Sequence, residues 1–133
     1  MNSNDYKRIR QGDIFIADLG DGVGSVQRGI RPVLILQNDK GNVYSNTSIV
    51  IPITSKISKK DLPVHVKLNG NNLSGTGLLV ESMLLMEQVR VVDKSQLRNK
   101  IGTVNEYILN QAIATMYINF TKQFSISKAV CCA

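Results

Sequence analysis

The side chains that could do chemistry in this chain are mainly cationic or hydroxyl-bearing. Arg31 follows a glycine-rich stretch and precedes Pro32, whose ring restricts Arg31 to extended backbone. A guanidinium held in this way is well shaped to bind two phosphate oxygens. Thr54 ends an apolar run and offers a hydroxyl donor. The further polar candidates along the chain are Arg28, Ser55, Lys56, His65, Glu87, Gln88 and Arg90.

Cleavage of RNA is the reaction that suits such a set, because RNA supplies its own nucleophile, the 2′-hydroxyl. The enzyme must align that oxygen with phosphorus and stabilise charge on the phosphate oxygens. An arginine and a threonine suffice for these tasks, and no metal is then required. We find no P-loop, dinucleotide fingerprint, zinc motif or G-x-S-x-G elbow, and the acidic residues are scattered. The sequence therefore predicts neither a cofactor nor a metal.

Each main candidate has a structural alternative. The segment from Gln11 to Asp39 could be a surface hairpin with two solvated arginines, and Arg31 could pair with a carboxylate. Thr54 could be a β-branched residue that ends a strand. Lys56 is either solvated or a steering charge for phosphate. These alternatives stay open on the residues alone.

The remaining candidates also have a structural and a functional interpretation. Histidine is a common general base at neutral pH, yet His65 alternates with Val64 and Val66, which favours exposure to solvent. Glu87, Gln88 and Arg90 could line a pocket for a base or could pair with each other.

Charge and composition favour an anionic partner and a cytoplasmic location. The 133 residues carry a net charge of +6 with a pI near 9.5. We find no apolar run long enough to span a bilayer and no secretory signal after the N-terminal charges. Cys131 and Cys132 are the only cysteines, which gives no disulfide framework. The segment from Thr54 to Lys67 is locally basic, although a solvated lysine-rich loop is the simpler interpretation.

Short apolar segments separated by turns must position these side chains. They predict strands at 12–19, 31–38, 47–54, 63–68, 78–80 and 83–92. Pro52 suggests an edge strand or a bulge, and Asp39 to Asn42 reads as a turn. A helical turn capped by Asp93 is expected over 93–99. Apolar residues at steps of three and four then predict a helix over 105–120, with capping-box spacing from Thr103.

This order of elements predicts a mainly β fold with a C-terminal helix, built as a small, strongly bent antiparallel sheet or barrel. We expect residues 1–10 to form a basic arm, 11–120 the single domain, and 121–133 a disordered tail. The apolar stripe of the helix suits the core or a dimer contact better than a ligand site.

An ordered series of short motifs resembles the MazF/PemK family of toxin endoribonucleases, especially its Gram-positive members. The motifs cover about residues 10–120. They are Arg10-Gln11-Gly12-Asp13, Ala17-Asp18-Leu19, Gly24-Ser25 with Gln27, Gly29-Ile30-Arg31-Pro32-Val33-Leu34, Gln37-Asn38-Asp39, Ile53-Thr54, Leu62-Pro63 with His65-Val66, Leu85-Met86-Glu87-Gln88-Val89-Arg90, and Asp93-Lys94.

The resemblance implies an SH3-like barrel of the CcdB/MazF type, a homodimer, and metal-independent cleavage of single-stranded RNA at short sequences. It implies 2′,3′-cyclic or 3′-phosphate and 5′-hydroxyl ends, and inhibition by a cognate antitoxin laid across the RNA groove. The family's catalytic arginine corresponds to Arg31 and its catalytic threonine or serine to Thr54. Ser25 and Gln27 then become RNA contacts, or else residues that simply fill the loop.

Two positions depart from the family pattern. Val26 stands where glutamate is common, which could alter base preference, and Arg28 stands where a small residue is common, which adds charge. An apolar surplus at Leu78, Leu79, Met83, Leu84 and Met86 agrees with a dimer. The rival functions are a toxin of the same fold that binds a protein target such as gyrase, and a non-catalytic RNA-binding barrel.

Overall fold

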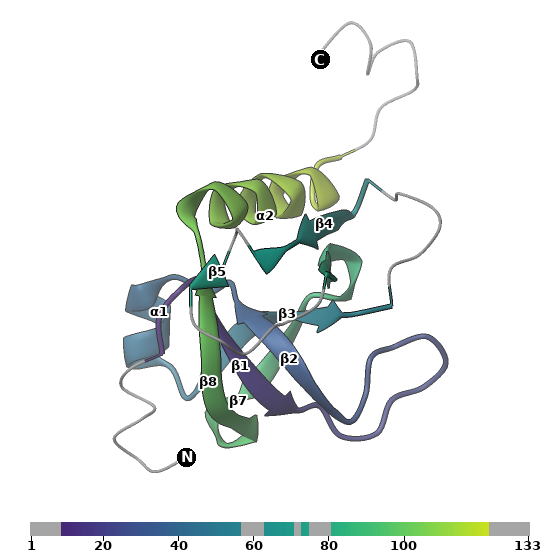
Figure 1. Cartoon of the computed structure of the whole chain (residues 1–133). Coiled ribbons are helices and arrows are strands. Elements are labelled where there is room, and N and C mark those ends of the chain that lie inside the picture. Colours follow the sequence, from purple (N-terminus) through teal and green to yellow (C-terminus); the bar gives the residue numbers. More distant parts are fainter. Residues whose placement is uncertain (1–8, 57–62, 71–72, 75–80, 123–133) are drawn as a thin grey trace, which may run out of the picture.

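A computed structural model describes residues 9–56, 63–70, 73–74 and 81–122 of the chain. Eight strands, one short and one long α-helix and two 3-10 turns make up this part (Figure 1). In chain order they are β1 (Asp13–Asp18), β2 (Ile30–Ile35), α1 (Asp39–Tyr44), β3 (Thr47–Thr54), β4 (His65–Leu68), β5 (Leu73–Ser74), β6 (Ser82–Leu85), η3 (Met86–Gln88), β7 (Arg90–Asp93), η4 (Lys94–Gln96), β8 (Leu97–Val104) and α2 (Glu106–Asn119).

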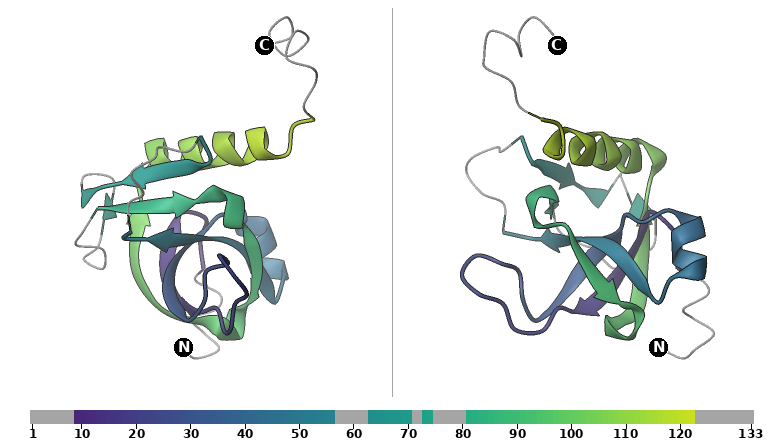
Figure 2. Two further views of the ribbon diagram at one scale, coloured as in Figure 1. Left: turned by 90° about the vertical axis from the view of Figure 1, so that its right-hand side faces the viewer. Right: turned by 180° about the vertical axis from the view of Figure 1, so that it is seen from behind.

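The strands form one antiparallel sheet that curls on itself. Its order is β4-β6-β3-β2-β1-β8-β5, and β7 also pairs with β3. Figure 2 shows the strands wrapping around a common interior, with α2 lying across the top of the molecule. The expected mainly β fold with a C-terminal helix and a small barrel is confirmed.

Two apolar clusters fill the molecule, because both faces of the central strands are covered. The barrel core lies inside the curl of the sheet and includes Phe15, Val33, Ile35, Val50 and Leu97. The helix-side core lies between the sheet and α2. It comprises Ile14, Leu34, Ile51, Ile53, Val66, Leu68, Leu84, Met86, Val104, Ile108, Ala112 and Met116. Alternate residues of β2 and β3 therefore enter different cores.

Helix α2 confirms the predicted helix, but of its apolar stripe Ile108, Ala112 and Met116 are buried, whereas Ile113, Tyr117 and Phe120 are exposed. The cap of α2 also differs from the prediction. Asn105 is the N-cap, and its side chain accepts from the Ile108 amide at 2.9 Å. Thr103 was expected to cap the helix. It belongs instead to β8, where its hydroxyl donates to the Asp13 carboxylate. Because β8 pairs with β1 as far as Thr103, the N-cap of the helix lies two residues after Thr103, at Asn105.

The predicted strand over 83–92 is wrong, because the chain turns in its middle. It forms β6, then the 3-10 turn η3, then β7, and both strands pair with β3. The turn capped by Asp93 is confirmed as η4. The Ser95 hydroxyl and amide both donate to Asp93 and hold the pKa of its carboxyl below the usual range. The expected turn did not extend to residue 99, since β8 begins at Leu97.

Pro52 lies in a central strand rather than at an edge or a bulge. The Ile49 carbonyl accepts hydrogen bonds from the amides of Leu36 and Gln37, which follow β2. Backbone polar groups of successive strand residues point to opposite sides of the strand, so the nitrogen of Pro52 points to the side of β3 away from β2. On that side β7 pairs with β3 up to Val50, and β6 pairs with it from Ile53. The missing N–H of Pro52 therefore coincides with the change of partner strand, where no ladder bond is lost.

The expected turn at Asp39 to Asn42 is the start of α1, which carries a buried polar network. Asn42 is 1% exposed and accepts from the Ser48 hydroxyl at 2.7 Å. Its side-chain amide donates to the Gln37 carbonyl at 2.9 Å. Lys94, which is 9% exposed, donates its ammonium to the Asn42 carbonyl. This network joins α1, β3 and η4.

Several predicted features lie outside the described residues. They are the strand at 78–80, the basic loop residues 57–62, most of the arm 1–10, and residues 123–133 of the predicted tail. Within the described part, no helix combines the length and the apolar character needed to cross a membrane.

Candidate functional site

Arg31 and Thr54 lie on β2 and β3, on the stretch where these two strands are no longer paired with each other. The β2–β3 register runs from Ile35 with Val50 to Val33 with Pro52, and its continuation places Arg31 opposite Thr54. Beyond Val33 the strands separate (Figures 1 and 2), since β2 stays with β1 while β3 pairs with β6. By alternation both side chains lie on the barrel-core face. The two residues that we expected to act therefore stand on the two arms of the fork between β2 and β3, on the same face of the sheet.

The guanidinium of Arg31 is oriented by its own loop. Its Nε donates to the Arg28 carbonyl at 3.1 Å, and Gly29 between them has φ +76°. This left-handed conformation, which glycine adopts freely, turns the Arg28 carbonyl back towards β2. Within the described part of the chain no carboxylate pairs with Arg31, so the purely structural alternative is not supported. The two terminal nitrogens of Arg31 remain for a ligand.

Thr54 is the last residue of β3 and is 6% exposed. Its hydroxyl oxygen accepts from the Lys56 amide at 3.1 Å, which leaves the hydroxyl proton available for donation. Lys56 itself is exposed just beyond the strand. A buried hydroxyl fixed by a backbone amide can present its proton in a constant direction.

Residues 19–29, here called the glycine loop, are tied to the η3–β7 segment. The Gln88 side chain accepts from the Gln27 amide at 2.8 Å and donates to the Ser25 carbonyl at 3.1 Å. Arg90 donates to the Leu19 carbonyl at 3.4 Å. Backbone bonds between Gly20 and Gly29 and between Leu19 and Gly29 close the base of the loop, each at 2.8 Å.

His65 does not have the solvent exposure that alternation favoured. Its side chain is 9% exposed, and its Nε2 lies 2.7 Å from the Glu87 carboxylate. Val66 enters the helix-side core as expected, but η3 places Glu87 against the opposite face of β4. Among the described residues, Glu87 thus bonds to β4, Gln88 and Arg90 bond to the glycine loop, and the three do not pair with each other.

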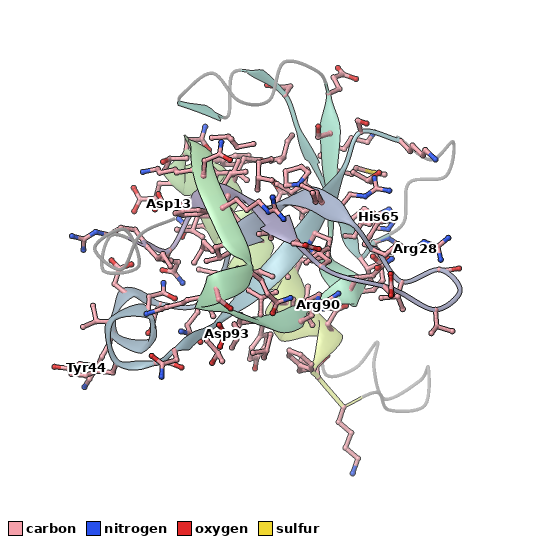
Figure 3. The ribbon with its side chains drawn as sticks, turned by 90° about the horizontal axis from the view of Figure 1, so that it is seen from below. Asp13, Arg28, Tyr44, His65, Arg90 and Asp93 are labelled. Atoms are coloured by element: carbon pink, nitrogen blue, oxygen red, sulfur yellow. The ribbon has the colours of Figure 1, made fainter. Side chains whose placement is uncertain are left out.

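Among the described residues, two buried side-chain polar atoms of this region have no hydrogen-bond partner: Oε1 of Gln27 and Nδ1 of His65. Buried polar atoms are nearly always paired, so unpaired ones suggest a ligand or water. Around them, Ser25, Val26 and Arg28 are exposed on the glycine loop. Figure 3 shows Arg28 and His65 on the loop side of the molecule, away from Asp13 and Tyr44.

Asp18, the last residue of β1, anchors the base of the loop and was missed as a positioning group. The Asp18 carboxylate accepts from the Gly20 amide at 3.0 Å and pairs with Arg98 at 3.3 Å. Gln96 donates to the Asp18 carbonyl at 2.9 Å. An aspartate two residues before a glycine is a known turn signal, so Asp18 was recognisable from the sequence. Gln96 carried no such signal, because its contact joins distant segments.

Taken together, the site can bind an anion. Four cations, Arg28, Arg31, Lys56 and Arg90, lie along the loop and the adjoining strand ends, and Glu87 contributes a carboxylate bonded to His65. Arginine nitrogens and a threonine hydroxyl are good donors to phosphate oxygens.

Comparisons with known proteins show which family and which fold the chain resembles. Residues 10–120 match the family described as PemK-like, MazF-like toxin of type II toxin-antitoxin system. The chain is 39% identical to Endoribonuclease EndoA of Bacillus subtilis over 111 residues, which cover 84% of this chain and 93% of that protein. It is 45% identical to Endoribonuclease MazF of Staphylococcus saprophyticus over 98 residues, with coverage of 74% and 79%. A mycobacterial endoribonuclease solved with its cognate antitoxin has the same fold, with a TM-score of 0.66 at 16% identity and coverage of 86% and 99%.

Proposed function

This chain belongs to the PemK-like, MazF-like family of toxins from type II toxin-antitoxin systems, and we propose that it cuts single-stranded RNA without a metal ion. The observation that carries the proposal is the fork between β2 and β3, because the register of these strands, continued past Val33 and Pro52, sets Arg31 and Thr54 on its two arms. Both are polar residues at the mouth of an apolar core, where donors act more strongly than in water. The names of the two bacterial relatives, both endoribonucleases, support the same activity.

In the proposed reaction the 2′-oxygen of one nucleotide attacks the adjacent phosphorus. The bond from phosphorus to the 5′-oxygen breaks, and that oxygen leaves as a 5′-hydroxyl after gaining a proton, while the 2′-hydroxyl loses one. The products are a 2′,3′-cyclic phosphate, which water can open to a 3′-phosphate, and the 5′-hydroxyl end. The terminal nitrogens of Arg31 bind two phosphate oxygens, and Thr54 donates to the same group.

The RNA strand would follow the glycine loop and η3. Ser25, Gln27, Arg28 and Lys56 offer contacts to backbone or bases. His65, Glu87, Gln88 and Arg90 complete the lining, with Gln88 and Arg90 bonded to the loop itself. The unpaired Oε1 of Gln27 can accept from an unstacked base, and the unpaired Nδ1 of His65 can accept from it or donate to it according to the tautomer. Val26 is 50% exposed on the loop and cannot accept a hydrogen bond, so we expect it to influence which base is chosen.

Incubation of the protein with a mixed pool of single-stranded RNA in EDTA tests the activity. Arg31→Ala is expected to abolish cutting while RNA binding is largely kept. Arg10→Ala removes the same charge from a side chain that is 67% exposed and bonded to Asp39, so it serves as the matched control. No cleavage by the wild-type protein at any sequence would reject the proposal in favour of a toxin that binds a protein. Binding without new RNA ends would favour a non-catalytic RNA-binding barrel.

We also propose a homodimer, although on different residues from those first considered. Met83, Leu84 and Met86 are buried within one subunit, whereas Leu78 and Leu79 lie outside the described residues. A hollow of about 580 Å³ instead lies between α2 and the start of β3. Its exposed apolar rim consists of Ile49, Ile113, Tyr117 and Phe120, with Val91 paired to Ile49 across the strands.

Sedimentation at micromolar concentration tests the dimer. Tyr117→Lys is expected to give a monomer, because a charge would enter the apolar contact, while Tyr107→Lys, at a similarly exposed position near the start of α2, is expected to remain dimeric. A wild-type monomer at this concentration would contradict the proposal.

The toxin family and the mycobacterial complex support a cognate antitoxin as the second partner. We propose that it lies across the same RNA site, in the cytoplasm, so that a bound antitoxin should prevent cleavage.

A further inference from the structure

Both polar atoms of the Gln88 side-chain amide are hydrogen-bonded to the glycine loop. Its oxygen accepts from the Gln27 amide at 2.8 Å, and its nitrogen donates to the Ser25 carbonyl at 3.1 Å. These two bonds hold the loop backbone on either side of Val26. A side chain engaged in this way would have to break both bonds before it could read a base with the same atoms.

The clamped segment leads directly to the guanidinium of Arg31. Arg28 follows Gln27, and its carbonyl accepts from Nε of Arg31 at 3.1 Å. Gly29 then returns the chain to the base of the loop through its bond with Gly20 at 2.8 Å. The Arg28 carbonyl is therefore fixed from both sides. The bonds of Gln88 to Gln27 and Ser25 hold the chain before it, and the Gly29–Gly20 bond holds the chain after it.

We propose that Gln88 is a positioning residue for Arg31: it fixes the loop so that the Arg28 carbonyl holds Nε and directs the two terminal nitrogens to the scissile phosphate. This inference rests on the proposed ribonuclease function. The role is distinct from contact with RNA, because its effect passes through backbone atoms of the loop. Rate enhancement by positioning requires such fixed geometry.

Gln96 offers a matched control in the same protein. Its oxygen accepts from the Asp93 amide at 2.8 Å, and its nitrogen donates to the Asp18 carbonyl at 2.9 Å. Gln88→Met and Gln96→Met therefore each remove one accepted and one donated bond with a backbone group, at nearly constant volume. Only the first change touches the segment that leads to Arg31.

A measurement that needs no RNA tests the clamp itself. In NMR spectra of the labelled protein, we expect slow hydrogen exchange at the Gln27 amide and an observable Nε–H signal for Arg31. Gln88→Met should speed the first and broaden or shift the second, while Gln96→Met should change neither. Unchanged signals in Gln88→Met would overturn the inference, even if the protein cuts RNA. The NMR measurement still tests whether Gln88 fixes the loop if the wild-type protein proves inactive on RNA.

Kinetics with a defined RNA test the consequence for catalysis. Gln88→Met should lower kcat and kcat/KM equally, by roughly 100-fold, which is the loss expected from misplacing a catalytic group by about an ångström. The cut sites should stay the same, and Gln96→Met should retain the wild-type kcat. A variant that keeps kcat but raises KM or moves the cut sites would show that Gln88 reads RNA directly and would overturn the positioning role.

Discussion

Gly29→Ala tests whether the base of the glycine loop is held as rigidly as its hydrogen bonds indicate. Gly29 has φ +76°, and a methyl group added there would meet no atom within 4 Å. The cost is therefore conformational rather than steric, and it amounts to about 1 kcal/mol.

The backbone could avoid that strain only by rotating Gly29 out of the left-handed region. Rotation would break the bonds from Leu19 to Gly29 and from Gly29 to Gly20, both 2.8 Å long. Each contributes about 1 kcal/mol, so relaxation loses about 2 kcal/mol to recover about 1. We therefore expect the backbone to stay in place, with Arg31 still oriented and kcat nearly unchanged.

Urea unfolding of the two proteins measures the effect. A loss of about 1 kcal/mol should lower the midpoint by roughly 0.5 M, with an unchanged slope. Gly29→Asn should lose less, because asparagine tolerates the left-handed region better than alanine does. If Gly29→Ala keeps full stability but loses RNA cleavage, the loop has relaxed and the reasoning from the two backbone bonds is refuted.

Three further changes probe other parts of the account. Thr54→Val should lower kcat by about 100-fold through loss of one donor to the phosphate, whereas Thr54→Ser should retain most activity, as single-turnover cleavage would show. Lys94→Met should lower the free energy of unfolding by about 1–3 kcal/mol, because it leaves the Asn42 carbonyl without the Lys94 donor. Denaturant titration measures this loss, and an unchanged free energy of unfolding would show that water replaces the contact. Arg28→Ala should reduce the slope of log affinity for single-stranded RNA against log salt by about 0.7, the share of one phosphate contact, and an unchanged slope would place Arg28 away from the backbone.

The sequence predicted most of the elements because their signals are local. The apolar run of β1, the turns around it and the periodicity of α2 each lie within one short window. β8 was missed because Arg98, Asn99 and Lys100 are all exposed and give no strand pattern. Its conformation is set by pairing with β1, a contact between residues 80 to 90 positions apart that no local window can contain.

The residues of the site were also predicted better than their arrangement in space. Arg31 and Thr54 were nominated by their chemistry and by resemblance, but their places on the two arms of the fork follow from the β2–β3 register, which the sequence does not display. His65 was misjudged because alternation assumes that the face away from the core meets solvent. Here the turn η3 brings Glu87 over that face, so the histidine is paired and largely buried.

The central claim is that RNA is cut by its own 2′-hydroxyl, with Arg31 and Thr54 bound to the phosphate. The most direct measurement uses an RNA with a single 2′-deoxynucleotide on the 5′ side of a mapped cleavage site, incubated with the protein in EDTA. The account predicts that this one bond stays intact while unmodified sites are cut, leaving 2′,3′-cyclic phosphate and 5′-hydroxyl ends. Cleavage at the 2′-deoxy position would contradict it.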